Sequence, residues 1–296
     1  VVLMNGFEDD FVPKGEEFEK KRKYARALLL NLANKLLGTH LGDDTLIVGT
    51  SGRYEFKNKG INVYLEALNR LTRKKSLNRE VLAFVNVPGW VGDAREDLKQ
   101  RLESDKDYDT PLECPFITHW LHNMPEDKVL NYINHAGFTN AASEKLKIIF
   151  VPCYLDGKGG IFNKTYYDML IGMDATVYPS YYEPWGYTPL ESVAFRVPTI
   201  TTDLAGFGLW VNSLKNQHGI NDGVEVLHRS DYNYSEVADG IKDTVALFST
   251  KTEAEIKEIR KRAGQVAEQA LWKHFIQYYY EAYDIALRNA MKRQLK

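Results

Sequence analysis

The chain has 296 residues, 44% hydrophobic and 26% charged, which is enough apolar material for one large domain or two small ones. Its formal net charge is -2, from 38 basic and 40 acidic side chains, so a dedicated nucleic-acid-binding protein is disfavoured. No apolar run approaches a membrane span, and no signal peptide is recognisable. The two cysteines, Cys114 and Cys153, lack metal-type spacing, so we expect no disulfide framework and a reducing, cytoplasmic location.

The first quarter of the chain has the pattern of an α/β protein. Apolar residues at helical spacing predict helices over residues 16–37 and 61–71, and a short apolar run predicts a buried strand over 45–50. A polar loop with two cations, Arg53 and Lys59, joins this strand to the second helix. Open α/β sheets bind ligands at the carboxyl ends of their strands, so both cations are candidates for contacting a diphosphate. The alternative is that they are ordinary solvated surface cations.

The middle of the chain continues the alternation of strands and helices. We expect an exposed helix over residues 92–102 and an irregular insertion or loop over 103–120. The glycine-rich loop at 156–160 lacks the Gly-Lys-Ser/Thr of a P-loop, so it is not assigned to phosphate binding. The other elements expected here are a strand at 80–87, a helix at 127–136, a strand at 145–151, a helix at 166–171 and a strand at 175–178.

The stretch over residues 178–208 is the most unusual part of the sequence. It carries two carboxylates, Glu183 and Glu191, around a bend rich in proline, glycine and aromatic residues. A helix is expected to begin near residues 188–189, and the N–H groups at its start would form an anion site. These N–H groups belong to Gly186, Tyr187 and Thr188. One carboxylate could then bind a sugar hydroxyl and the other a ribose, with a phosphate between them. Alternatively, each glutamate is an ordinary solvated side chain.

The last third of the chain completes the pattern with more strands and helices. We expect strands at 199–202 and 223–227, helices at 210–217 and 235–248, and a long helix over 253–288 with a break near Trp272. Six strand candidates alternating with helices predict a Rossmann-like, mostly parallel sheet with helices on both faces. Since no Gly-x-Gly-x-x-Gly follows the first strand, a dehydrogenase is disfavoured. One nucleotide-binding domain over residues 1–296, helical from about 253, is the simplest organisation.

Two long motifs, at residues 52–60 and 178–189, resemble those of the eukaryotic-type, UDP-glucose-dependent glycogen synthases. Residues 201–208 fit the same family. The resemblance implies the C-terminal, donor-binding half of a two-domain GT-B glycosyltransferase, without the N-terminal domain that carries the acceptor site. The region that resembles the family's arginine-dense regulatory helix offers only Arg260 and Arg262 among its arginines, which favours a bacterial relative and leaves sugar-phosphate control in doubt.

The resemblance also implies roles for individual residues. Arg53 and Lys59 would neutralise the donor diphosphate, Glu183 would lie at the transferred glucose, and Glu191 would hold the ribose. A family tyrosine that stacks on uracil matches Tyr166, with the neighbouring Tyr167 as the alternative register. Catalytic roles fall to Glu183, Arg53 and Lys59. The implied donor-binding set is Arg53, Lys59, Tyr166, Glu183, Trp185, Gly186, Tyr187, Thr188 and Glu191.

The activity implied is retaining transfer of glucose from UDP-glucose to the non-reducing end of an α-1,4-glucan. We expect no metal and no cofactor, since no Asp-x-Asp is placed to bind a metal. The expected partners are the donor, the glucan and the protein's own N-terminal domain, without which the fragment would be poorly active or inactive. Alternatives are a GT-B enzyme with another donor such as ADP-glucose, or a non-catalytic nucleotide- or glucan-binding module. Self-association and regulation are left open.

Overall fold

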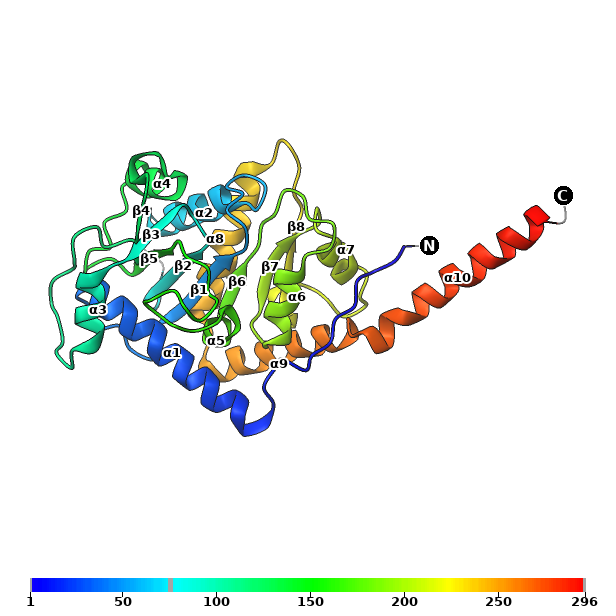
Figure 1. Ribbon diagram of the computed structural model, residues 1–296, viewed down its shortest axis with the longest axis horizontal. Coiled ribbons are helices and arrows are strands. Elements are labelled where there is room, and N and C mark those ends of the chain that lie inside the picture. The colour runs from blue at the N-terminus through cyan, green and yellow to red at the C-terminus, as the bar shows by residue number, and fades with distance from the viewer. Residues whose placement is uncertain (1, 74–76, 295–296) are drawn as a thin grey trace.

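The computed structural model describes residues 2–73 and 77–294, which surround a six-stranded sheet (Figure 1). Its strands are all parallel and lie in the order β5–β2–β1–β6–β7–β8. They are β1 Leu46–Ser51, β2 Val81–Asn86, β5 Leu146–Val151, β6 Ala175–Val177, β7 Thr199–Thr202 and β8 Val224–Leu227. The six predicted strands are therefore confirmed. The chain runs outward from β1 to one edge and resumes at β6 beside β1, so the switch point where such sheets bind ligands lies between these two strands.

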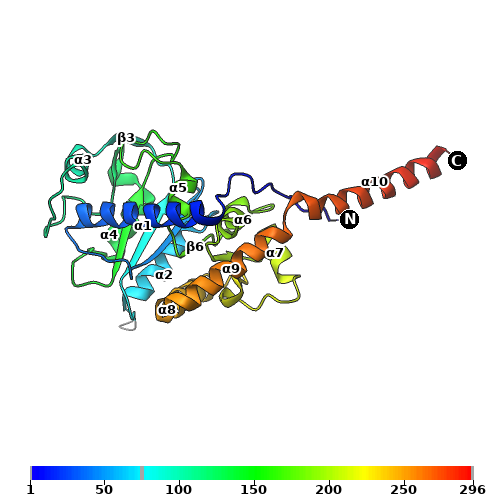
Figure 2. The same ribbon diagram turned by 90° about the horizontal axis from the view of Figure 1, so that it is seen from below.

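Helices cover both faces of the sheet (Figure 2). Strand residues alternate between the two layers: Leu46 and Val48 pack with α2, α4 and α8, whereas Ile47 and Leu82 pack with α1, α3 and α5. Both faces are thus buried, as parallel sheets require. The helices are α1 Gly15–Leu37, α2 Ile61–Arg73, α3 Glu96–Glu103, α4 Lys128–Ala136, α5 Tyr166–Leu170, α6 Tyr187–Ala194, α7 Gly206–Asn212, α8 Tyr234–Thr250, α9 Glu253–Gln269 and α10 Trp272–Gln294.

A small antiparallel sheet corrects the prediction for residues 92–120. Strands β3 Val91–Ala94 and β4 His119–Leu121 pair where a helix and an irregular segment were expected, and α3 begins only at Glu96. The segment before β4 is held by Arg95, whose fully buried guanidinium donates to the backbone carbonyls of Glu113, Cys114 and Ile117. A buried arginine gives no apolar signal, which explains why the pattern was missed.

Helix α7 begins four residues earlier than the predicted helix at 210–217. Its first turn contains two glycines, which are poor helix formers and hid the start. Both glycines are required by close backbone approaches: a Cβ would lie 2.4 Å from the Pro184 carbonyl oxygen at Gly206, and 2.1 Å from the Thr202 carbonyl oxygen at Gly208. Close contacts with neighbouring backbone, rather than helix propensity, therefore require glycine at these two positions.

The predicted long C-terminal helix is two helices, α9 and α10, separated at Ala270 and Leu271. The amino-terminal segment crosses this point: the Phe7 N–H donates to the Ala270 carbonyl at 3.4 Å, and the Trp272 N–H donates to the Phe7 carbonyl at 3.1 Å. Beyond the crossing, α10 extends away from the rest of the protein (Figures 1 and 2). Among the described residues, no helix is long and apolar enough to cross a membrane.

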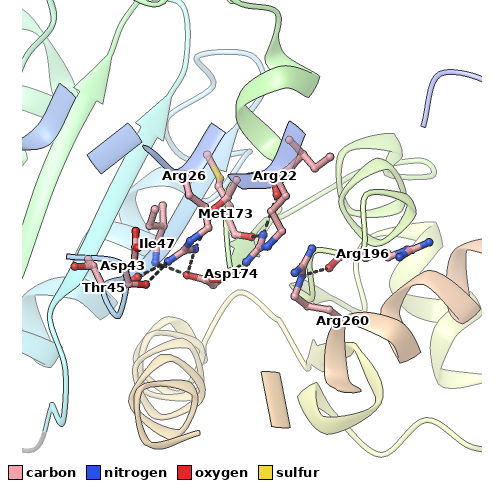
Figure 3. A network of polar contacts seen from close by, with 11 residues as sticks. Arg22, Arg26, Asp43, Thr45, Ile47, Met173, Asp174, Arg196 and Arg260 are labelled. Carbon is pink, nitrogen blue, oxygen red and sulfur yellow. Dashed lines mark hydrogen bonds and ion pairs between the residues drawn. The ribbon is translucent and has the colours of Figure 1, made fainter. Parts of the chain in front are cut away.

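Helix α1 is tied to the amino ends of β1 and β6 by a buried ionic network (Figure 3). The Asp174 carboxylate accepts from Arg22 and Arg26, at 2.7 Å each, and from the Ile47 N–H at 2.9 Å. Burial favours the neutral form of Asp174, but Arg26 and Arg22 hold its pKa below the ordinary range. This network lies at the opposite end of the strands from the switch-point loops, so it stabilises the fold at a distance from them.

Candidate active site

Two loops meet at the carboxyl ends of β1 and β6, where residues 52–60 follow β1 and residues 178–186 follow β6. The Tyr181 N–H donates to the Asn58 carbonyl oxygen at 2.7 Å. At Gly60, which has a φ of +69°, a Cβ would lie 2.1 Å from the Pro179 carbonyl oxygen, so only glycine fits there. Backbone contacts therefore hold the two predicted motifs against each other.

The contact between these loops places Lys59 directly against Glu183. The Lys59 Nζ and the Glu183 Oε2 form an ion pair, and their side chains are only 13% and 19% exposed. The two residues come from loops that were predicted to lie at one edge of the sheet, and the structure brings them together. A half-enclosed Lys–Glu pair is a site whose cation and carboxylate can each be offered to a ligand.

Glu183 is positioned by a third segment, the turn before α7. Its N–H donates to the Leu204 carbonyl and its carbonyl accepts from the Gly206 N–H, each at 3.2 Å. Two residues on, the Trp185 carbonyl accepts from the Phe207 N–H at 2.7 Å. These bonds fix the main chain on both sides of the carboxylate, so its position does not depend on a flexible loop.

Helix α6 begins at Tyr187, slightly earlier than the predicted start at residues 188–189. Gly186 precedes it with a φ of +106°, and no side chain caps the helix start. The first N–H groups of a helix have no partner within it, so those in the turn from Tyr187 remain free to meet an anion. Pro189 lies in this first turn, as expected. The predicted cradle thus has the geometry that anion binding needs.

Glu191 lies in the next turn of α6 and is half-buried. Its Oε1 accepts a hydrogen bond from the Tyr167 hydroxyl at 2.9 Å. Burial raises the pKa of Glu191, and the bond from Tyr167 partly opposes this rise. The Tyr167 ring stacks with Phe11 and Phe195, at centroid distances of 4.9 and 5.2 Å, so it belongs to an aromatic cluster.

The Tyr166 hydroxyl lies at the carboxyl end of β1. Its hydroxyl accepts from the Ser51 Oγ at 2.8 Å and lies 2.7 Å from the Tyr178 hydroxyl. Ser51 and Tyr178 were not predicted as site residues, although a polar residue at the end of a buried strand is a signal that could have found them. With Tyr167 committed to packing, Tyr166 remains the better candidate for stacking on a base.

Two of the predicted residues lie apart from this centre. The Trp185 indole is buried against Phe207, Trp210 and Phe275, so its side chain packs in an aromatic cluster and only its backbone faces the cradle. The Arg53 side chain is 75% exposed, with its Nε 3.2 Å from a Glu55 oxygen. Its assignment to the diphosphate stays a prediction. Among the described residues, no cluster of three or more His, Cys, Asp or Glu side chains is placed to hold a metal ion.

The parallel sheet and its loops define the Rossmann-like α/β fold of GT-B glycosyltransferases. The crystal structure of Anabaena HepE in complex with UDP-glucose is similar to this chain with a TM-score of 0.51 and 16% identity, covering 96% of this chain and 57% of HepE. The HepE structure with UDP and glucose gives a TM-score of 0.50 over 96% of this chain and 56% of HepE, at 16% identity. This likeness confirms the predicted fold.

The chain belongs to the glycogen synthase family, because the family's sequence model, Glycogen synthase, matches residues 91–296. It is 27% identical to glycogen [starch] synthase isoform 1 of Saccharomyces cerevisiae over 86% of this chain and 44% of the yeast protein. It is 24% identical to the liver glycogen [starch] synthase of Mus musculus over 98% of this chain and 48% of the mouse protein. The chain therefore spans less than half the length of these relatives. A bacterial source stays a prediction.

Proposed function

We propose that this chain is the donor-binding half of a retaining glucosyltransferase that moves glucose from UDP-glucose to the non-reducing end of an α-1,4-glucan. The observation that carries this proposal is the Lys59–Glu183 ion pair at the switch point, next to the uncapped start of α6. Membership of the glycogen synthase family supports the reaction, and the HepE complex with UDP-glucose supports the donor class. The acceptor-binding half would be a second domain.

In this proposal the donor diphosphate lies at the start of α6. The Lys59 ammonium group exchanges Glu183 for the phosphates, and the exposed Arg53 side chain moves toward them. These cations and the helix N–H groups stabilise the charge that develops on UDP as it leaves, which typically contributes about 3–4 kcal/mol per well-placed donor. Glu191 accepts from the ribose, and Tyr166 stacks on the uracil. No metal and no cofactor is required, because protein groups supply the positive charge.

Glu183 would bind the transferred glucose through its hydroxyls rather than attack its anomeric carbon. A covalent glucosyl-enzyme formed by Glu183 is the less favoured version of the mechanism. Retention then requires that the acceptor hydroxyl attack from the face that UDP leaves. The bond from glucose to UDP breaks as the bond to the acceptor forms, and the acceptor proton passes to the departing phosphate oxygen.

Calorimetry on the 296-residue chain tests the donor site directly. We expect UDP to bind more tightly than ADP, and the variant Lys59→Ala to lose at least tenfold in UDP affinity. Lys20→Ala is the matched control, because Lys20 is 80% exposed on α1 and pairs with Glu16 on the same helix. Unchanged UDP affinity in Lys59→Ala would contradict the assignment, and stronger binding of ADP would favour an ADP-glucose enzyme.

A non-catalytic nucleotide-binding module is the remaining alternative, because the chain spans less than half of its relatives. Glucose transfer from UDP-glucose by the enzyme that joins this chain to an acceptor-binding half decides between the two. UDP binding without any transfer would favour the module. A cytoplasmic location belongs to the same proposal, and it fits the free thiols of Cys114 and Cys153.

A further inference from the structure

A second cavity lies beside the active site, on the other side of the paired loops. It has a volume of about 450 Å³ and is lined by residues from the start of α2, the loop after β6 and the segment after β8. This volume is within the range of about 300–1,000 Å³ that small-molecule sites occupy. The loop after β1 also lines it, through Lys57 and Asn58. None of the residues proposed to contact the donor lines the cavity, so it has no assigned occupant.

Within the described part of the chain, one buried polar atom in this cavity has no hydrogen-bond partner, and a buried cation beside it has no counter-charge. The Asn62 Oδ1 is buried and accepts no hydrogen bond. The Arg229 side chain is 6% exposed, donates to the Pro179 carbonyl and lies over the Tyr181 ring, with 5.6 Å between guanidinium and ring centroid. Burial lowers its pKa, and among the described residues no carboxylate forms an ion pair with it. Buried groups left in this state indicate a missing ligand.

The chemistry of these groups selects the kind of ligand. A hydroxyl can donate to the Asn62 amide oxygen and accept from Arg229, so one sugar hydroxyl or two neighbouring ones would satisfy both groups. A phosphate would satisfy Arg229 through its ionised oxygens, but only its protonated oxygen could donate to the Asn62 Oδ1. The cavity is lined by the Asp231 carboxylate as well as by the cations Lys57 and Arg229, so an anion would meet both attraction and repulsion there. A neutral, hydroxyl-rich ligand therefore fits best.

Aromatic rings around the cavity supply apolar faces for such a ligand. Tyr181 and Tyr234 line it and are 40% and 38% exposed, while Tyr182 and Tyr232 stand nearby in sequence at 62% and 94%. A tyrosine ring offers an apolar face and a polar hydroxyl together, which matches the C–H faces and hydroxyl edges of a sugar ring. The gathering of exposed tyrosines on this side favours a carbohydrate occupant.

We propose that this cavity binds a glucose unit of the α-1,4-glucan acceptor, and so forms an acceptor subsite on the donor half. The proposal rests on the proposed function. The cavity is linked to the reaction centre by the Tyr181–Asn58 backbone bond, since Asn58 precedes Lys59 and Tyr181 lies two residues before Glu183. A glucan held here stays close to the donor, which raises the effective concentration of its free ends.

Titration of the 296-residue chain with maltoheptaose, followed by calorimetry, tests this subsite. We expect saturable binding to the wild type and at least tenfold weaker binding to Asn62→Ala and Tyr234→Ala. Tyr280→Ala is the matched control, because Tyr280 is 60% exposed on α10, remote from the cavity. Each variant is also titrated with UDP, and an unchanged UDP affinity shows that the fold and the donor site are intact.

Absence of saturable maltoheptaose binding to the wild type would overturn the subsite, and so would equal affinities in wild type, Asn62→Ala and Tyr234→Ala. Displacement of maltoheptaose by millimolar inorganic phosphate would also overturn it in favour of an anion site. These outcomes are separate from the fate of the proposed function. If the chain binds UDP but not maltoheptaose, the donor site stands and the proposed subsite is wrong. If it binds maltoheptaose but not UDP, only the proposed donor site is contradicted.

Discussion

Lys59 and Glu183, 124 residues apart in sequence, form an ion pair that joins the loops after β1 and β6. The pair places one positive and one negative charge within a site where the proposed reaction needs both. Within this pair each charge is compensated by the other. A bound diphosphate would compete with Glu183 for the ammonium group, so donor binding and release of the carboxylate would occur together.

The variant Glu183→Gln separates these two roles. It removes the charge that competes for Lys59, so we expect UDP affinity to be maintained or increased. Glucose transfer by the intact enzyme is expected to fall about 100–1,000-fold, as is typical for loss of one group that stabilises the transition state. Calorimetry measures the first effect and steady-state kcat the second. Glu281→Gln on α10 is the control, and a parallel loss of UDP affinity in Glu183→Gln would contradict the competition.

Tyr166 is expected to bind the base by stacking rather than through its hydroxyl. Base stacking is worth about 1–3 kcal/mol, so Tyr166→Ala should weaken UDP binding about 5–150-fold. Tyr166→Phe keeps the ring but loses the contacts with Ser51 and Tyr178, so its UDP affinity should stay within about threefold of the wild type. UDP calorimetry on the chain measures both. Equal losses in the two variants would instead assign the hydroxyl network the main role.

Gly206 is expected to tolerate no side chain, because its Cβ would lie 2.4 Å from the Pro184 carbonyl oxygen. The variant Gly206→Ala should displace the segment that carries Glu183 and cost about 1–3 kcal/mol of unfolding free energy, as overpacked sites do. Gly264→Ala in α9 is the control, since its Cβ would meet only the Arg196 side chain and alanine favours a helix by about 0.5–1 kcal/mol. Urea denaturation distinguishes them, and equal stabilities would refute the close approach.

The Asp174 network is expected to make stability depend on acidic pH. The pKa of Asp174 is lower in the folded chain than in the unfolded chain, where it is about 3.9. The ionised carboxylate therefore makes its full contribution to the free energy of unfolding above about pH 3.9. This contribution is lost as the pH falls through the pKa of Asp174 in the folded chain. Asp174→Asn leaves Arg22 and Arg26 buried without a counter-charge and should cost about 3–5 kcal/mol at pH 7. Urea denaturation between pH 7 and pH 3 measures this. If the stability of Asp174→Asn falls as steeply with acid as that of the wild type, the prediction is contradicted. Asp284→Asn on α10 is the control.

The sequence predicted the central strands well because they are largely apolar runs bounded by polar loops. The runs ending at Ser51 and Val151 are buried on both faces, and short apolar runs of this kind are typical of the central strands of a parallel sheet. Tertiary contacts decided the elements that were predicted wrongly. Arg95 organises the small sheet from a fully buried position. The break near Trp272 was predicted, and the bonds from Phe7 to Ala270 and Trp272 show what holds the chain there.

The sequence predicted which two loops form the candidate site, but not which of their side chains contact each other. The motifs around Lys59 and Glu183 marked the loops, and the parallel topology placed both at one edge. The pairing of these two side chains depends on the Asn58–Tyr181 and Gly60–Pro179 approaches, which no local pattern encodes. In the same way, Arg229 follows an ordinary short strand, and only the folded chain shows that it is buried without a counter-charge.

Helix α10 has a consequence for the local stability of the chain. It has 23 residues and therefore a length of about 35 Å, and apolar side chains such as Tyr283, Leu287 and Met291 stay 57–63% exposed along it. Phe275 packs against Trp185 and Trp210 at the start of the helix, but the rest buries little and is held mainly by its backbone bonds. Isolated helices of this kind are marginal in water. We expect its amide hydrogens to exchange with solvent orders of magnitude faster than those of β1 and β2, with protection declining from Phe275 toward residue 294. The part of the chain that unfolds cooperatively would then end near the crossing with Phe7. The helicity of α10 would depend on what the helix contacts.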